Sequence, residues 1–170
     1  MITKENPVIQ DGNPTLRQIA IPIDFKKDQD ELALTLKNMR TILNRFPDGV
    51  AIAAPQIDIS KRIFILSHEL FPKEKLPLVY INPCIVKTSK KTSFVEEGCL
   101  SVRGIFGFAK RYNQITIEAY DAHGVKFRRG VSGLIAQIYQ HEIDHLNGIL
   151  FCDHARDLAP YEVPEMRDQE

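Results

Sequence analysis

Residues 140–148, which read QHEIDHLNG, constrain this chain more than any other part of its sequence. On a helix, His141 and His145 lie one turn apart on the same face, where two imidazoles can grip one metal ion. Glu142 lies beside them as a candidate base for a water molecule activated by that metal. A catalytic metal of this kind needs a third protein ligand, and the identity of that ligand decides the reaction.

The residues around the histidines favour a functional helix over an ordinary amphipathic one. Ser132 suits the N-cap position, and Gly148 is typical of a residue that ends a helix. Residues four positions apart form one line along this helix, which changes from a small residue to a polar one and then to metal-binding side chains. A purely structural helix would place aliphatic side chains there. The line consists of Gly133, Gln137, His141 and His145.

Downstream ligands that complete other HExxH sites are missing or poorly supported. One known pattern requires a histidine where this chain has Phe151. Glu165 has the spacing of a downstream glutamate ligand, but Pro160 and Pro164 disfavour the helix that would carry it. A peptidase of the HExxH type is therefore the weaker alternative.

The three cysteines are the remaining ligand candidates, and their odd number fits reduced thiols better than a disulfide framework. Cys84 and Cys152 are interpreted as small buried residues. Cys99 follows a predicted strand, with Gly98 permitting an unusual backbone and Glu97 offering a supporting carboxylate. Taken alone, Cys99 is better explained as a buried structural thiol. Beside the HExxH helix, the interpretation as a metal ligand becomes much stronger.

Hydrophobic periodicity predicts a helix, several strands and a second helix. Apolar residues recur at helical spacing over residues 32–46, and the uncharged segment 49–56 indicates a buried connector. The β-rich runs cover 62–66, 78–81, 114–120 and 125–128, and a hairpin is expected between 85–88 and 92–95. Because no βαβ alternation occurs, we expect an α+β fold with mostly antiparallel sheets around a central C-terminal helix that carries HExxH.

Length and composition bound the remaining possibilities. With 170 residues, 44% of them hydrophobic, the chain is expected to form one domain over 1–170, with a loosely organised tail over about 154–170. The formal net charge of zero gives no argument for nucleic acid or an anionic membrane as partner. No apolar run approaches roughly 18 residues, and the first residues lack a secretory signal. We therefore expect a cytoplasmic protein.

Three stretches together resemble the peptide deformylases: GVAIAAPQ at 49–56, EGCLS at 97–101 and QHEIDHLNG at 140–148. Their order and spacing are also similar to that family, over about residues 10–153. The resemblance implies a hydrolase that removes the N-formyl group from the N-terminal formylmethionine of newly made polypeptides and releases formate. Its partners would be N-formylated nascent peptides, with the ribosome as a further candidate.

The resemblance also implies roles for individual residues. The metal ligands would be Cys99, His141 and His145, binding one divalent ion, with Fe²⁺ expected and Zn²⁺, Ni²⁺ or Co²⁺ able to substitute. Glu142 would be the general base, while the Gln56 side chain and the Leu100 backbone N–H would stabilise the oxyanion. The residues implied in substrate binding are Val50, Ala51, Ile52, Glu97, Gln137 and Ile138.

The chain departs from the family pattern at three positions. The family usually has glycine at Ala51, often proline at Arg103, and a more apolar residue at Gln137. These departures leave the metal ligands intact, but they keep open a deformylase-like protein with altered substrate or weak activity. Arg111 has two interpretations, a surface arginine or the partner of a carboxylate near the site such as Glu97.

Overall fold

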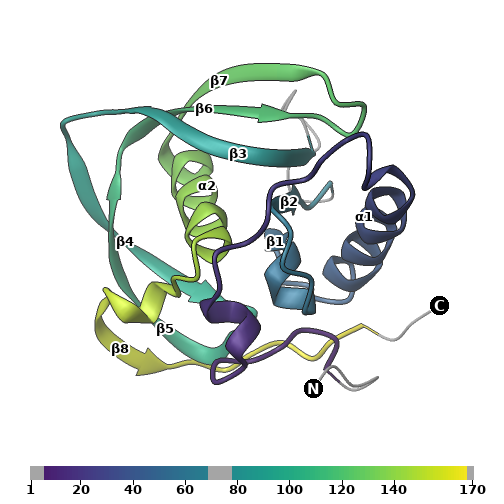
Figure 1. The fold of residues 1–170 in the computed structure, drawn as a ribbon. Coiled ribbons are helices and arrows are strands. Elements are labelled where there is room, and N and C mark those ends of the chain that lie inside the picture. Colours follow the sequence, from purple (N-terminus) through teal and green to yellow (C-terminus); the bar gives the residue numbers. More distant parts are fainter. Residues whose placement is uncertain (1–5, 69–77, 168–170) are drawn as a thin grey trace.

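A computed structural model describes residues 6–68 and 78–167 of the chain (Figure 1). The helices are α1 (Gln29–Leu43) and α2 (Gly133–Leu146), with 3-10 turns η1 (Pro14–Arg17), η2 (Ala54–Ile57) and η3 (Phe151–Asp153). The strands are β1 (Ala51–Ala53), β2 (Ile63–Leu66), β3 (Val79–Thr88), β4 (Thr92–Cys99), β5 (Val102–Tyr112), β6 (Gln114–Tyr120), β7 (Lys126–Ser132) and β8 (Arg156–Pro160). The predicted α+β fold is confirmed.

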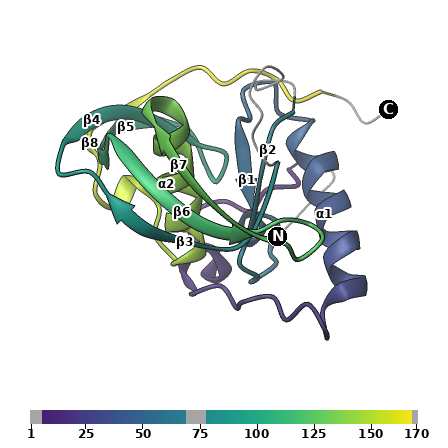
Figure 2. The same ribbon diagram turned by 90° about the horizontal axis from the view of Figure 1, so that it is seen from above.

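Two antiparallel sheets enclose α2. One has five strands in the order β1-β2-β3-β6-β7, and the other has three in the order β4-β5-β8. The views in Figures 1 and 2 show α2 between these sheets and α1 on the outer side of β1 and β2. Strands β1 and β4 are edge strands of their sheets, so their outer edges border the space beside α2. Among the described helices, none has the length and apolar character needed to cross a membrane.

The apolar run of β2 is buried on both faces because a helix covers each face. Ile63 and Ile65 pack into the cluster that contains the apolar side of α1. Phe64 and Leu66 point the opposite way and pack with the apolar side of α2. Such a strand shows continuous rather than alternating hydrophobicity, which explains the uninterrupted β-rich run in the sequence.

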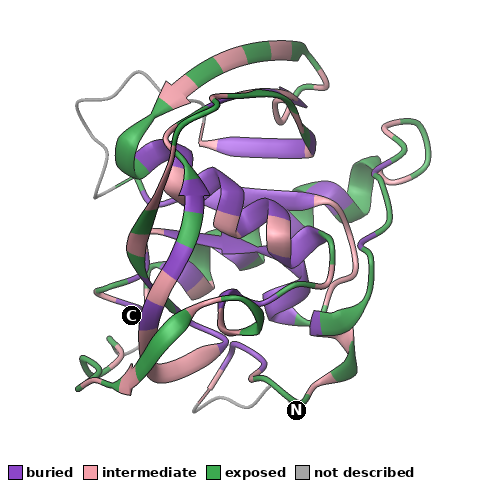
Figure 3. Cartoon of the chain, turned by 90° about the vertical axis from the view of Figure 1, so that its left-hand side faces the viewer, coloured by how far each residue is buried: buried purple, intermediate pink, exposed green. Residues whose placement is uncertain are grey.

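The helix α2 is fixed in rotation by the residue that precedes His141. The Gln140 side chain accepts a hydrogen bond from the Tyr112 N–H (2.9 Å) and donates to the Tyr112 carbonyl oxygen (3.0 Å) on β5. It also donates to the carbonyl oxygen of Ala136, one turn earlier in α2 (2.8 Å). Figure 3 shows this helix largely buried. A buried amide with these partners holds one helix face toward β5 and the other toward β1.

The predicted hairpin between 85–88 and 92–95 is wrong. Strand β3 pairs with β6 and β4 pairs with β5, so the chain crosses from one sheet to the other at residues 89–91. The Ser89 N–H donates to the Gln114 carbonyl oxygen and the Asn113 N–H to that of Lys91, which joins this corner to the β5–β6 corner. A hairpin and a corner share the same local turn signals, and long-range pairing selects between them.

The predicted loose tail is also wrong for residues 156–160, which form β8 along β5. Beyond this strand the Tyr161 N–H donates to the Gly104 carbonyl oxygen (2.9 Å) and the Arg167 N–H to that of Arg45 (2.8 Å). The prolines that argued against a helix are compatible with an edge strand. Residues 168–170 lie outside the described ranges, and the expectation of one domain stays a prediction.

Gly148 provides a test of how closely α2 approaches the N-terminal arm. Its φ is +75°, and a Cβ there would lie 2.6 Å from the Arg17 carbonyl oxygen. We expect Gly148→Ala to lower the free energy of unfolding by about 2–4 kcal/mol, because positive φ and backbone overlap both cost energy. Urea denaturation measures the loss.

The matched control is Gly124→Ala. Gly124 has a nearly identical φ of +77°, but its Cβ would meet only a Phe25 ring carbon at 3.4 Å. The control should therefore lose about 1–2 kcal/mol from backbone conformation alone. Equal losses in the two variants would contradict the importance of the close approach at Gly148.

Candidate active site

A cavity of about 430 Å³ lies between the two sheets beside α2. Its walls come from the chain at the start of β1, the end of β4, the start of β5 and one face of α2. Cys99, His141 and Glu142 lie at this cavity together with Gln56 and Leu100. Residues that are far apart in the sequence therefore meet in one concave space, as an enzyme site requires.

Cys99 and the two histidines form one group of potential metal ligands. Their donor atoms all lie within 4.8 Å of one another, and Cys99 Sγ is 3.2 Å from His145 Nε2. Strand β4 delivers the cysteine, and α2 delivers both imidazoles. The pairing register of β4 with β5 shifts between Gly98 and Cys99, an irregularity of the kind that re-aims a side chain. A thiolate with two imidazoles is a common donor set for divalent metals.

A buried network of charges orients His141. Its Nδ1 lies 3.0 Å from Glu97 Oε2, which leaves Nε2 for the metal group. Arg111 donates to both Glu97 oxygens, from Nε at 2.7 Å and from Nη2 at 2.8 Å, and it also binds Asp144. Burial alone would raise the pKa of Glu97, but hydrogen bonds from Arg111 and His141 outweigh it and lower that pKa to about 2.

This network resolves two expectations from the sequence. Arg111 is only 7% exposed, so its interpretation as a surface arginine is wrong and its pairing with carboxylates near the site is confirmed. Glu97 was expected to bind substrate, and it does border the cavity. Its two oxygens, however, are engaged by Arg111 and His141, so its visible contacts support the metal ligand.

The charges around the group fit a divalent cation. Glu142 is 3% exposed, and within the described part of the chain its Oε2 has no hydrogen-bond partner. Burial raises the pKa of Glu142 to about 7. Burial also disfavours a charged His141, yet hydrogen bonds to Cys99 and Glu97 raise its pKa well above the usual value. These residues favour a positive charge between them, which a metal ion would supply.

Gln56 is held so that its amide nitrogen faces the metal group. Its Oε1 accepts a hydrogen bond from the Ala53 N–H (2.8 Å), so the amide must turn its donor the other way. The Nε2 donates to Ser101 Oγ (3.2 Å) and lies 3.6 Å from Cys99 Sγ. Gln56, the polar residue at the end of an apolar run, therefore has the hydrogen-bond partners that a buried side chain needs.

The predicted substrate pocket is only partly assembled as expected. Val50, Gln137 and Ile138 line the cavity, and Gln137 Nε2 donates to the Glu96 carbonyl oxygen (2.7 Å). Ile52 is 0% exposed and packs in the cluster with α1, against the prediction that it lines the pocket. Alternation along β1 is the reason, since neighbouring side chains of a strand point to opposite faces.

Ala51 replaces the usual glycine without backbone strain. Among the described residues other than glycine, positive φ occurs only at Asp58, Asn82 and Asp157. The methyl group of Ala51 packs with the core cluster on the α2 side of the sheet. The position therefore accepts an alanine, although it borders the cavity.

Several cavity residues escaped the sequence analysis: Asp48, Leu134, Phe106 and Tyr161. Tyr161 had no detectable signal because it lies in the segment predicted to be loose. Asp48 lies just before the segment 49–56 that was interpreted as a buried connector. Phe106 on β5 and Tyr161 after β8 are brought together because these two strands pair, and local patterns do not encode pairing between distant strands.

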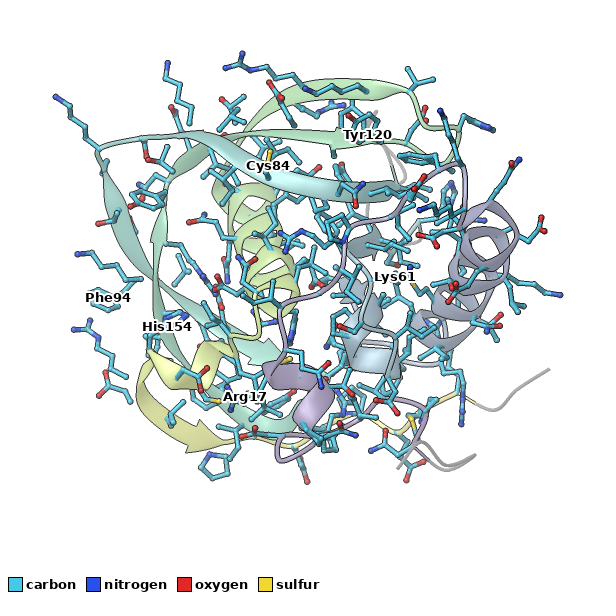
Figure 4. The ribbon with its side chains drawn as sticks, viewed as in Figure 1. Arg17, Lys61, Cys84, Phe94, Tyr120 and His154 are labelled. Carbon is cyan, nitrogen blue, oxygen red and sulfur yellow. The ribbon has the colours of Figure 1, made fainter. Side chains whose placement is uncertain are left out.

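The other candidate ligands lie outside the metal group. Cys84, predicted to be buried, is exposed on β3 (Figure 4), and Cys152 is half-buried. Within residues 6–68 and 78–167, the metal-binding group contains neither of them, nor Glu165, which is exposed. The downstream ligand of an HExxH peptidase is therefore not supplied by Glu165. The fold and the site together define the class of HExxH metal-dependent hydrolases, with Cys99 placed where it could complete the group of metal ligands.

Comparison with known proteins narrows this class to one family. The sequence model of the family described as polypeptide deformylase matches residues 5–160. A peptide deformylase of Ligilactobacillus salivarius (strain UCC118) is 39% identical, covering 97% of each chain. One from Rhizobium meliloti (strain 1021) is 38% identical, over 89% of this chain and 86% of the relative. The chain therefore belongs to the polypeptide deformylase family.

Solved structures agree with this assignment. A peptide deformylase from Synechococcus elongatus in complex with actinonin superimposes with a TM-score of 0.80 at 33% identity, covering 92% of this chain and 83% of the other. The enzyme from Thermotoga maritima gives a TM-score of 0.79 at 33% identity, covering 90% and 99%. Family members are metal-dependent enzymes that remove N-formyl groups from new polypeptides, so the predicted family and enzyme class are confirmed.

Removal of Arg111 tests the charge network. We expect Arg111→Met to lower the free energy of unfolding by about 3–5 kcal/mol, because it leaves the buried Glu97 carboxylate without its partner. Arg128→Met is the control, since the exposed Arg128 lies 4.0 Å from Glu118 and should change stability by about 0.5 kcal/mol or less. Urea denaturation at neutral pH compares them, and a loss for Arg111→Met no larger than the control would contradict the proposed support.

Proposed function

We propose that this chain removes the formyl group from the N-terminal formylmethionine of newly made polypeptides and releases formate. One observation supports this function above all others. A buried glutamate, Glu142, lies in the same cavity as the group formed by Cys99, His141 and His145. A purely structural metal site has no need for a general base, whereas amide hydrolysis requires one.

The two edge strands suggest how the peptide is bound. β1 and β4 belong to different sheets, and the cavity lies between residues at their ends. An extended peptide laid there would pair its backbone with strand edges, a common mode of peptide recognition. Val50, Gln137 and Ile138 would receive the methionine side chain.

Cys99, His141 and His145 would hold one divalent ion. We propose Fe²⁺ as that ion, with Zn²⁺, Ni²⁺ or Co²⁺ as substitutes, because thiolate and imidazole donors suit all four. When bound, such an ion lowers the pKa of a water molecule towards about 7. Glu97 and Arg111 would keep the His141 ring in the orientation that metal binding needs.

The remaining steps belong to side chains and backbone of this chain. Glu142 accepts a proton as water adds to the formyl carbon, and it then donates that proton to the leaving amine. Gln56 Nε2 and the Leu100 N–H donate hydrogen bonds to the formyl oxygen as its negative charge develops. One water molecule and one formylated amine thereby become formate and a peptide with an N-terminal amine.

The cellular setting follows from the substrate. Formylated N-termini belong to nascent chains, so we propose that the enzyme meets them in the cytoplasm, at or near the ribosome. The formal net charge of zero predicts no strong general attraction to ribosomal RNA. Capture of the substrate would then depend on the cleft itself.

Formate release is the direct test of this function. The protein, purified without oxygen and loaded with Fe²⁺ or Ni²⁺, should release formate from formyl-Met-Ala-Ser. Glu142→Ala should lower kcat by about 10²–10⁴-fold, as expected for loss of a general base. Cys99→Ser should lose metal, measured by elemental analysis, whereas Cys84→Ser at an exposed cysteine should keep both metal and activity.

Different failures carry different meanings. An inactive metal-loaded parent would overturn the proposed reaction. Full metal content in Cys99→Ser would overturn the ligand assignment, and cleavage at internal peptide bonds would favour the peptidase alternative.

The pH dependence of kcat/KM provides a second test. Burial raises the pKa of Glu142 to about 7, and a neighbouring divalent cation lowers it again. Glu142 must be ionised to accept a proton, so activity should rise with pH and its acid limb should lie below pH 7. The profile is measured across the acid and neutral range with metal content checked at each pH. An acid limb at higher pH would count against this role.

A further inference from the structure

Arg103 joins the two walls of the cleft at its mouth. Its guanidinium donates to both carboxylate oxygens of Asp48, from Nη1 at 2.5 Å and from Nη2 at 3.2 Å. Asp48 precedes β1 of the five-stranded sheet, whereas Arg103 belongs to β5 of the three-stranded sheet. Both residues border the cavity, so their ion pair ties one sheet to the other beside the site.

The same guanidinium holds the C-terminal segment. Arg103 Nη2 donates to the Pro164 carbonyl oxygen (3.1 Å), three residues beyond Tyr161. The guanidinium also lies over the Phe46 ring, 5.4 Å from its centroid. Figure 1 shows the yellow segment running from β8 past β5 toward α1. The planar fork of an arginine can serve several acceptors at once, which a lysine cannot do equally well.

Tyr161 brings the C-terminal segment into the cavity. A Cβ built on Gly98 would lie 3.5 Å from Tyr161 Oη, so the hydroxyl rests against β4 next to Cys99. The Tyr161 ring packs edge-on against Phe106, with centroids 6.4 Å apart. Both rings line the cavity. The end of β4 therefore faces an aromatic wall, part of which comes from the C-terminal segment that Arg103 binds at Pro164.

The substrate residues that follow the formylmethionine would reach this aromatic wall. Val50 lines the proposed methionine pocket, and Asp48 lies two residues before it, in the turn closed by the hydrogen bond from the Gly49 N–H to the Phe46 carbonyl oxygen (3.0 Å). Asp48 and Arg103 border the same cavity as Val50, where a peptide longer than one residue would reach them. The second and third residues of a bound peptide would occupy that region.

We propose that Arg103 is a positioning residue for peptide capture. It binds Asp48 on one side of the cleft mouth and, at Pro164, the segment that carries Tyr161 on the other, so that residues after the formylmethionine meet a preformed wall. The inference rests on the proposed function and adds to it the residues that hold the rest of the peptide. The physical gain is preorganisation, because less conformational freedom is lost when the peptide binds. The Arg103 and Asp48 side chains are 18% and 28% exposed, so water screens this pair less than a fully exposed one.

Substrates of two lengths test this role. In Arg103→Gln, KM for formyl-Met-Ala-Ser should rise about fivefold while kcat stays within about twofold, since capture weakens and the chemistry does not change. The kinetic constants for formyl-methionine amide, which ends before the mouth, should stay at parental values. Arg103→Lys should recover part of the loss. Lys126→Gln, at an exposed ion pair with Glu118 between β7 and β6 and outside the cavity lining, is the control and should match the parent.

A binding measurement separates this inference from the proposed function. Calorimetric titration of formyl-Met-Ala-Ser into Glu142→Ala, with and without Arg103→Gln, reports capture without turnover. A Kd about fivefold weaker in the double variant supports the role of Arg103, whether or not the parent releases formate. An unchanged Kd, or equal KM changes for the long and short substrates, would overturn it. Asp48→Asn, which removes the charge but keeps the shape, replaces Arg103→Gln if thermal unfolding shows that the latter does not fold.

Discussion

The buried charge of Arg111 is the interaction on which the site depends most. Desolvation of a guanidinium is costly unless carboxylates surround it, and here Glu97 from β4 and Asp144 from α2 do so. The network therefore joins the three-stranded sheet to the helix where both contribute to the group of Cys99, His141 and His145. Through Glu97 it also sets the orientation of His141. The carboxylates that neutralise the buried Arg111 therefore include the one that orients His141.

The position of the cleft follows from how the sheets share the two helices. The five-stranded sheet is covered by α1 on one face and α2 on the other, so alternate side chains of β1 and β2 belong to different cores. Ile52 contributes to the α1 core, while its neighbour Ala51 borders the cavity. The cleft between β1 and β4 therefore leaves the two hydrophobic cores of the five-stranded sheet fully packed.

The centre and the mouth of the cleft differ in how far they follow the family. The metal group, Glu142 and Gln56 occupy positions where this chain matches the three family motifs. At the mouth, Arg103 stands where proline is frequent and binds Asp48 together with the C-terminal segment. The metal group at the centre is therefore combined with a mouth at which an ion pair links the two sheets.

The sequence by itself predicted the group of Cys99, His141 and His145 that the structure brings together, since the spacing of the two histidines on a helix is a local property and Cys99 lay in a recognisable motif. It also determined the fold class, because hydrophobic periods report element type. Only the tertiary structure decided that β3 and β4 enter different sheets, that Ile52 faces α1, and that Tyr161 reaches the cleft. These outcomes depend on pairing between distant strands, whose energy comes from burial in the assembled core and leaves no local pattern.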